Sequence, residues 1–162
     1  MATKTATTKS TKVKAIPDGY HSVTPYLIID GAARALDFYK RAFDAKELMR
    51  IPSPGDKIGH AEIKIGDSVV MLADVHAEMQ AHDPHHYKGS PVSLHVYVED
   101  VDKVAKQATA AGATVKRPVQ DQFYGDRSGT FEDPFGHTWH VSTHKEDLSS
   151  EEIGRRAAAQ KK

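Results

Sequence analysis

The sequence predicts an α+β domain made of two tandem βαβββ modules, which form a curved mixed sheet around a cleft. The order of one strand, one helix and three strands occurs twice, in residues 20–75 and again in residues 92–146. Residues 23–30 align with residues 92–99, so that Tyr26 matches His95. The glycines of the two halves also match at equal separation, Gly59 and Gly66 with Gly129 and Gly136. A repeat of this kind fixes the architecture, because each unit leaves a sheet face to be covered.

In the first module, residues 23–29 form a β-rich apolar run, and we predict a strand. Asp30 is the expected N-cap of a helix that continues to Phe43, because apolar residues follow it at helical spacing. Alternation in the third predicted strand places His60 and Glu62 on the face opposite to its apolar residues. The three strands after the helix are predicted at residues 46–51, 58–65 and 68–74.

The second module repeats this order after a polar linker at residues 76–91. Asp100 is the expected N-cap of its helix, and Gly112 suits the left-handed conformation that ends one. We therefore predict one domain over residues 17–148, preceded by a disordered tail at residues 1–16. In residues 149–162, Ser149 and Glu152 have the spacing of a capping box and predict a C-terminal helix. The strands of the second module are predicted at residues 92–98, 114–117, 127–132 and 138–143.

Composition excludes several classes of function. The 162 residues hold 22 basic and 22 acidic side chains, a balance that argues against a nucleic-acid partner held by phosphate contacts. The chain has no cysteine, which excludes disulfides, thiolate nucleophiles and thiolate-bound metals. No apolar run reaches membrane-spanning length and no signal peptide is visible, so we expect a cytoplasmic protein without a membrane partner.

Several segments together resemble the vicinal oxygen chelate superfamily, which includes glyoxalase I, bleomycin-resistance proteins and extradiol dioxygenases. The resemblance rests on the repeat, on residues 36–39 (LDFY) and on residues 132–139 (EDPFGHTW). Residues 59–62 (GHAE), 124–127 (YGDR) and 143–147 (THKED) look like its PhnB-like branch. The similarity covers roughly residues 20–150. It implies the two-module fold and a homodimer, of strand-exchanged or side-by-side arrangement.

The resemblance also implies four positions for metal ligands, on the first and last strands of each module. In this chain they fall on Thr24, Ser93, Val70 or Met71, and His140. Among these only the imidazole is a competent ligand, whereas a catalytic divalent site normally needs three or more protein ligands. We therefore expect neither a metal nor another cofactor.

Five polar side chains are candidates for binding a small organic ligand. By alternation and by the repeat, Tyr26, His60, Glu62, His95 and His140 are expected to border one concave, partly polar pocket. The same histidines and carboxylate could instead form a displaced metal site or an acid/base set near neutral pH. They could also be polar wall residues that bond to one another or to water.

Two further residues have alternative interpretations. Arg127 could hold a carboxylate or phosphate at the mouth of the cleft, or it could form a salt bridge to Asp126 or Asp133. Trp139 precedes His140 on the same strand, so it faces away from that histidine and is expected in the core.

The sequence thus predicts a glyoxalase/bleomycin-resistance-like protein that binds a small molecule between its modules, without a metal. The alternative is an enzyme with a non-standard site: a metal-dependent lyase, isomerase or dioxygenase, or an acid/base catalyst. The two hypotheses differ most directly in metal content.

Overall fold

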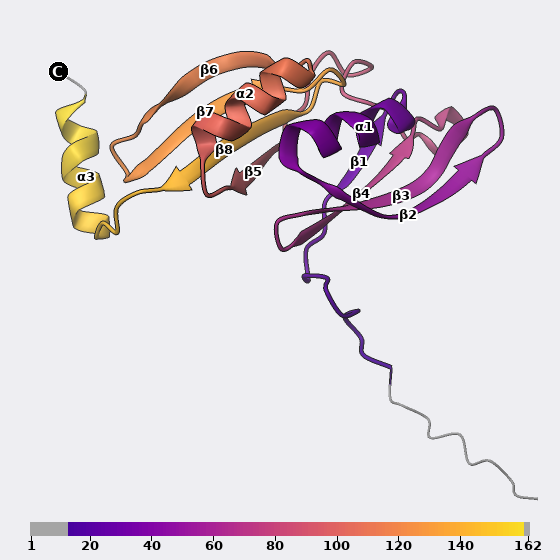
Figure 1. Ribbon diagram of the computed structural model, residues 1–162, viewed down its shortest axis with the longest axis horizontal. Helices are drawn as coiled ribbons and strands as arrows, with labels where there is room; N and C mark the ends of the chain where they lie inside the picture. The colour runs from indigo at the N-terminus through magenta and orange to yellow at the C-terminus, as the bar shows by residue number, and fades with distance from the viewer. Residues whose placement is uncertain (1–12, 161–162) are drawn as a thin grey trace, which may run out of the picture.

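The structure of this protein is a computed structural model, which describes residues 13–160 (Figure 1). Most of the predicted tail, residues 1–12, lies outside the described residues. The first module comprises β1 (Tyr26–Ile29), α1 (Ala32–Phe43), β2 (Lys46–Ser53), β3 (Lys57–Ile65) and β4 (Ser68–Asp74). A 3-10 turn, η1 (Ala77–Met79), lies in the segment between the modules. The second module comprises β5 (Ser93–Tyr97), α2 (Val101–Ala111), β6 (Thr114–Asp121), β7 (Asp126–Glu132) and β8 (Thr138–His144).

Each module forms its own four-stranded mixed sheet, with the strand orders β1-β4-β3-β2 and β5-β8-β7-β6. The first strand of each module runs parallel to the last, and the other pairs are antiparallel. The α+β class and the two tandem modules are therefore confirmed. Instead of one curved sheet, residues 13–160 hold two separate sheets side by side, with α1 and α2 on the same side of them (Figure 1).

One hydrophobic core continues through both modules. Phe38 and Tyr39 of α1 pack against Phe135 and Trp139 of the second module, with ring centroids 6.2 and 5.4 Å apart. Asp133 joins the two sides, because one of its oxygens accepts hydrogen bonds from the Tyr39 hydroxyl at 2.7 Å and from the Trp139 indole at 2.9 Å. A buried carboxylate needs such donors. The prediction that Trp139 lies in the core is confirmed, since it is 1% exposed.

The helices begin differently from the prediction. Gly31, with φ of 94°, is the N-cap of α1, and the exposed Asp30 makes no cap. Instead Asp74, at the end of β4, accepts hydrogen bonds from the amides of Gly31 and Ala32. A carboxylate brought in by the sheet thus satisfies the free amides of the first turn.

The second module uses the corresponding strand end for the same purpose. Thr143 of β8 accepts a hydrogen bond from the amide of Val101, the first residue of α2. Here the predicted cap is confirmed as well, because Asp100 accepts from the amide of Lys103. Gly112 ends α2 in the left-handed conformation, also as predicted.

Two strands differ in length from the prediction. β1 begins at Tyr26 because Pro25 has no amide proton to contribute to the sheet. β6 runs through Pro118 to Asp121, which is possible because β6 is an edge strand.

The C-terminal helix α3 (Ser150–Ala159) begins after Ser149, whose side chain accepts a hydrogen bond from the Glu152 amide. In Figure 1 it stands at the end of the molecule beyond the second sheet. None of the helices described between residues 13 and 160 has the length and apolar character needed to cross a membrane.

Candidate functional site

The face of each sheet opposite its helix carries the candidate side chains. In β3 the residues packed under α1, among them Ala61 and Ile63, are fully buried, whereas His60 points to the other face. Strand pairing aligns Met49 with Glu62 and Ile51 with His60 across β2 and β3. Directly paired residues share a face, so a half-exposed apolar border lies beside the polar residues of the first module.

Three predicted residues of the first module form a continuous hydrogen-bonded relay. The Tyr26 hydroxyl lies 2.9 Å from Nδ1 of His60, and Nε2 of His60 lies 3.1 Å from the carboxylate of Glu62. Because an ionised carboxylate only accepts, Nε2 donates to Glu62 and Nδ1 accepts the proton of the Tyr26 hydroxyl. These two contacts fix the orientation of the imidazole ring, with a hydroxyl at one end of the relay and a buried carboxylate at the other.

The carboxylate of Glu62 is buried and has a second partner. The Tyr20 hydroxyl, from the segment before β1, donates to its other oxygen. Burial raises the pKa of Glu62, but the hydrogen bonds from Tyr20 and His60 and the charge of His60 outweigh burial and lower it overall. Conversely, the pKa of Tyr26 is raised, by burial first and then by the negative charge of Glu62. Glu62 is therefore held in its charged form.

The second module pairs two histidines with hydroxyl groups. His140 of β8 has its Nδ1 3.0 Å from the Thr130 hydroxyl and its Nε2 3.1 Å from the Ser93 hydroxyl. The ring of His95 lies 6.0 Å from that of His140. Burial lowers the pKa of His140, and the charges of His95 and Arg117 lower it further. His140 is therefore held neutral at physiological pH.

Strand register shows which residues of the two modules correspond. Tyr26 pairs with Met71 and His95 pairs with His140, so Met71 rather than Val70 is the counterpart of His140. Val70 is buried on the other face.

The same register replaces the glycine match predicted from the repeat. Ala61 pairs with Leu72 and Gly129 pairs with Val141, so that Ala61, not Gly59, corresponds to Gly129. The predicted match of Gly59 with Gly129 is wrong because the two hairpins differ in length. Two residues connect β3 to β4, whereas residues 133–137 connect β7 to β8.

Glu62 of the first module and the two histidines of the second module line different hollows. His95 and His140 line a hollow of about 400 Å³ on the second module, together with Thr130 and Arg117. Glu62 lines another of about 410 Å³ beneath the segment that precedes β1. Within residues 13–160, no hydrogen bond or ring contact joins the first-module group to the second-module group. A single pocket bordered by all five residues therefore stays a prediction.

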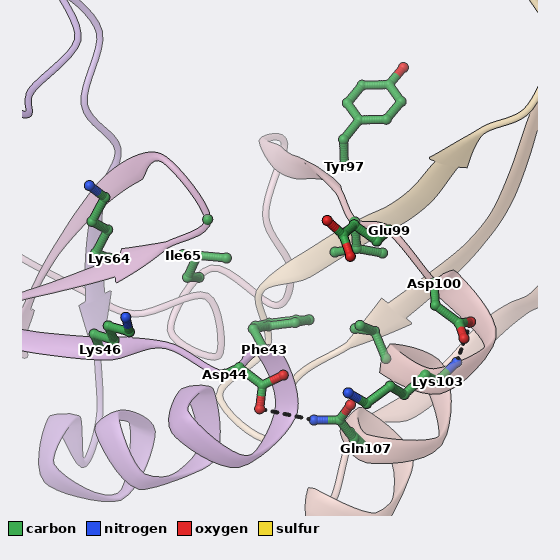
Figure 2. A pocket seen from close by; sticks show the side chains of 13 residues that line it. Phe43, Asp44, Lys46, Lys64, Ile65, Tyr97, Glu99, Asp100, Lys103 and Gln107 are labelled. Atoms are coloured by element: carbon green, nitrogen blue, oxygen red, sulfur yellow. Dashed lines mark hydrogen bonds between the residues drawn. The ribbon is translucent and has the colours of Figure 1, made fainter.

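A third cavity, of about 620 Å³, lies between the modules where α1 ends and α2 begins. Figure 2 shows Lys46 and Lys64 on its first-module side and Glu99 on the opposite side. At its base the Gln107 amide donates a hydrogen bond of 3.2 Å to Asp44. None of the predicted site residues lines this cavity.

Arg127 lies apart from the histidines. Thr130 faces His140, and strand alternation places Arg127 on the opposite, helix-covered face with the buried Phe131. Its guanidinium binds Asp102 of α2 through two hydrogen bonds of 2.8 Å and Asp121 through one of 3.1 Å. Arg127 does form salt bridges, although not with the expected Asp126 or Asp133.

The residues at the metal-ligand positions of the resembled superfamily do not fit a divalent ion. Thr24, Ser93 and Met71 supply two hydroxyls and a thioether beside the single imidazole of His140, and this set has no carboxylate. In the part of the chain from residue 13 to residue 160, no three histidine, aspartate or glutamate side chains gather as a metal site.

Three residues beside the predicted ones were missed from the sequence: Tyr20, Arg117 and Thr130. Tyr20 lies before the first strand, where no periodic pattern points to the sheet. Arg117 and Thr130 are cross-strand partners, and their register depends on irregularities in β6 that the sequence does not mark. One signal was present for Arg127, because alternation from the apolar Phe131 places it on the core face.

Comparison with known proteins gives the family. The model of the Glyoxalase/Bleomycin resistance protein/Dioxygenase superfamily matches residues 20–141. An uncharacterized protein of Mycobacterium bovis is 42% identical over 135 residues, which cover 82% of this chain and 89% of that relative.

Solved structures agree with this. TioX from Micromonospora sp. ML1 is 28% identical with a TM-score of 0.59, over 80% of this chain and 100% of that one. The fosfomycin resistance protein FosX from Mesorhizobium loti shares the fold at 19% identity, with a TM-score of 0.58, over 84% of this chain and 95% of that one. The family model matches most of this chain, and the fold and the two-module architecture agree with it. This chain therefore belongs to the Glyoxalase/Bleomycin resistance protein/Dioxygenase superfamily.

Proposed function

We propose that this protein binds a small polar organic molecule on the uncovered sheet faces of its two modules, without a divalent metal. The observation that carries the proposal is the placement of polar side chains on those faces. Tyr26, His60 and Glu62 share one face, and His95 and His140 share the other. Open, concave faces that combine apolar surface with a few fixed polar groups are typical of small-molecule sites.

The metal-free part of the proposal rests on the ligand set. Thr24, Met71 and Ser93 offer no strong donor for a divalent ion beside His140. The Glu62 carboxylate, which could serve as a displaced ligand, is already bonded to His60 and Tyr20. Metal analysis of tag-free protein after dialysis tests this part. We expect less than stoichiometric metal, and one bound ion per chain would contradict it.

We further propose that a second copy completes the binding cleft. In one chain Glu62 lines one hollow while His95 and His140 line another, and both sheets end in exposed edge strands, β2 and β6. Edge strands and open faces of this kind are usually covered in the native assembly. Light scattering should report twice the chain mass of 17.8 kDa at tens of micromolar. A monomer at that concentration would refute this step.

A thermal-shift screen with a library of small organic compounds tests the binding site. The wild type is compared with His60→Ala and His140→Ala, and with His86→Ala in the exposed segment between the modules as a matched control. We expect a stabilising ligand whose effect is reduced in the two face variants and unchanged in the control. If all four proteins gain equal stability from the same ligand, the site lies elsewhere.

The hydrogen-bonded relay of the first module favours a second candidate, an acid/base enzyme. The Tyr26 oxygen can take a proton from a bound ligand as its own hydroxyl proton passes to Nδ1 of His60, and the carboxylate of Glu62 stabilises the imidazolium that results. Ligands from the screen are incubated with the protein in deuterated solvent, and NMR follows exchange of their carbon-bound protons. Exchange that is lost in Tyr26→Phe and His60→Gln supports the enzyme, and no exchange above the protein-free rate supports the binding protein.

A further inference from the structure

The hollow on the second module contains positive charge and no acidic side chain. Its wall combines hydroxyl, amide and aromatic groups with imidazoles and one guanidinium. No aspartate or glutamate is among the residues that line it. Among its lining residues are His95, Arg117, Gln120, Tyr124, Thr130 and His140.

The guanidinium of Arg117 carries a full positive charge into this hollow, and within residues 13–160 it forms no ion pair. Arg117 pairs with Thr130 across β6 and β7, which places it beside the residue that bonds His140. Among the described residues no carboxylate lies within salt-bridge distance of it. Arg127, ten residues further along, is held by Asp102 and Asp121 on the other face. The two arginines therefore have opposite roles, one structural and one available to a ligand.

The surrounding groups suit an oxyanion that is partly removed from water. The hydroxyls of Thr130 and Ser93 fix the ring of His140, whose pKa is lowered by burial and by the charges of His95 and Arg117. Because the positive charge of Arg117 already disfavours protonation of His140, its electric field is not neutralised by a nearby negative charge. Arginine binds carboxylate and phosphate through paired hydrogen bonds, and a hollow of about 400 Å³ limits the ligand to a small molecule.

We propose that this hollow binds the anionic end of a small organic carboxylate or phosphate ester, with Arg117 as the residue that holds its charge. This inference rests on the proposed small-molecule function and names the class of ligand for it. The hydroxyl and amide groups around Arg117 then hold the less charged part of the same molecule.

The test uses two probes, inorganic phosphate and benzoate, titrated at constant ionic strength with chloride as the balancing anion. Binding is followed by the ring resonances of His140 in NMR spectra of the full chain. The wild type is compared with Arg117→Gln and with Lys116→Gln as the matched control. Lys116 precedes Arg117 on the same edge strand, pairs with Glu132 and does not line the hollow, so its substitution removes the same charge beside the site.

We expect saturable shifts with at least one probe in the wild type and in Lys116→Gln, and an affinity at least about tenfold weaker in Arg117→Gln. Stronger binding of phosphate than of benzoate assigns the phosphate ester, and the reverse assigns the carboxylate. Equal affinities in all three proteins, or shifts that do not saturate, would overturn the inference. If neutral compounds from the ligand screen bind at His140 while both anions fail, this inference falls and the proposed function stands.

Discussion

Where the first module places the buried carboxylate of Glu62, the second module places the hydroxyl of Thr130. The register of the two sheets makes these residues counterparts, as it does Tyr26 and His95, and Met71 and His140. The backbone plan is the same, but one face holds a negative charge enclosed by hydroxyl and imidazole donors. The other holds two histidines near an arginine. A duplicated fold can therefore present two chemically different surfaces to one ligand.

The largest difference between the modules is expected at the helix N-termini. Asp74 accepts hydrogen bonds from the amides of Gly31, Ala32 and Ile58, whereas Thr143 accepts only from that of Val101. Asp74→Ala leaves three amides without an acceptor and should lower the free energy of unfolding by roughly 3 kcal/mol. Thr143→Ala should cost roughly 1 kcal/mol. Chemical denaturation measures both, and equal losses would show that the two modules depend equally on their caps.

A smaller difference is expected between the two arginines of the second module. Arg127→Gln breaks a partly exposed, two-pronged ion pair with Asp102 and should lower the free energy of unfolding slightly. Arg117→Gln removes no ion pair and should stay within roughly 0.5 kcal/mol of the wild type. The same denaturation experiment decides this, and a larger loss for Arg117→Gln would assign Arg117 a structural role.

The second module also contains two histidines whose pKa values are shifted in opposite directions from 6.5. Burial lowers the pKa of His140, while hydrogen bonds to Asp126 and Asp147 raise that of His144. The folded state therefore loses stability through His140 as the pH falls below 6.5. The contribution of His144 is complete below 6.5 and is lost as the pH rises through its higher folded-state pKa. NMR titration of the two rings should give midpoints on opposite sides of 6.5, and one common midpoint would contradict both assignments.

The smallest expected effect concerns the tyrosines of the first module. A hydrogen bond to Glu62 is the main cause of the raised pKa of Tyr20, and the charge of Glu62 adds to the effect of burial on Tyr26. Glu62→Gln should therefore lower both phenol pKa values toward 10. Ultraviolet difference titration follows them, with Tyr26→Phe added to separate the two signals. Unchanged midpoints would show that Glu62 does not control the relay.

Periodicity and turn residues were enough to predict the order and type of both modules' elements. The repeat predicted the correspondence of Tyr26 with His95, and α1 and α2 begin the same number of residues after them. The predictions that were wrong concern features that depend on contacts between distant segments. Asp30 has the sequence signal of a cap, but a carboxylate 44 residues further along, Asp74, takes that role.

The site could be predicted only within each module. Alternation correctly placed His60 with Glu62 on one face, and His95 with His140 on another. Which arginine approaches the histidines depends on the register between β6 and β7, where two irregularities shift the pairing. A one-residue shift moves every side chain to the opposite face, so no local pattern could place Arg117 beside the histidines, although alternation from Phe131 was a signal against Arg127.

The carboxylate of Asp133 couples the unfolding of one module to that of the other. Besides the bonds from Tyr39 and Trp139, it accepts hydrogen bonds from the amides of Phe135 and His137. If either module opened alone, this buried charge would lose donors while it stayed enclosed by the other module. Partial opening is therefore disfavoured, and slowly exchanging amides in β3 and β8 should share one opening free energy in native-state hydrogen exchange. We therefore expect the duplicated halves to unfold as one cooperative unit.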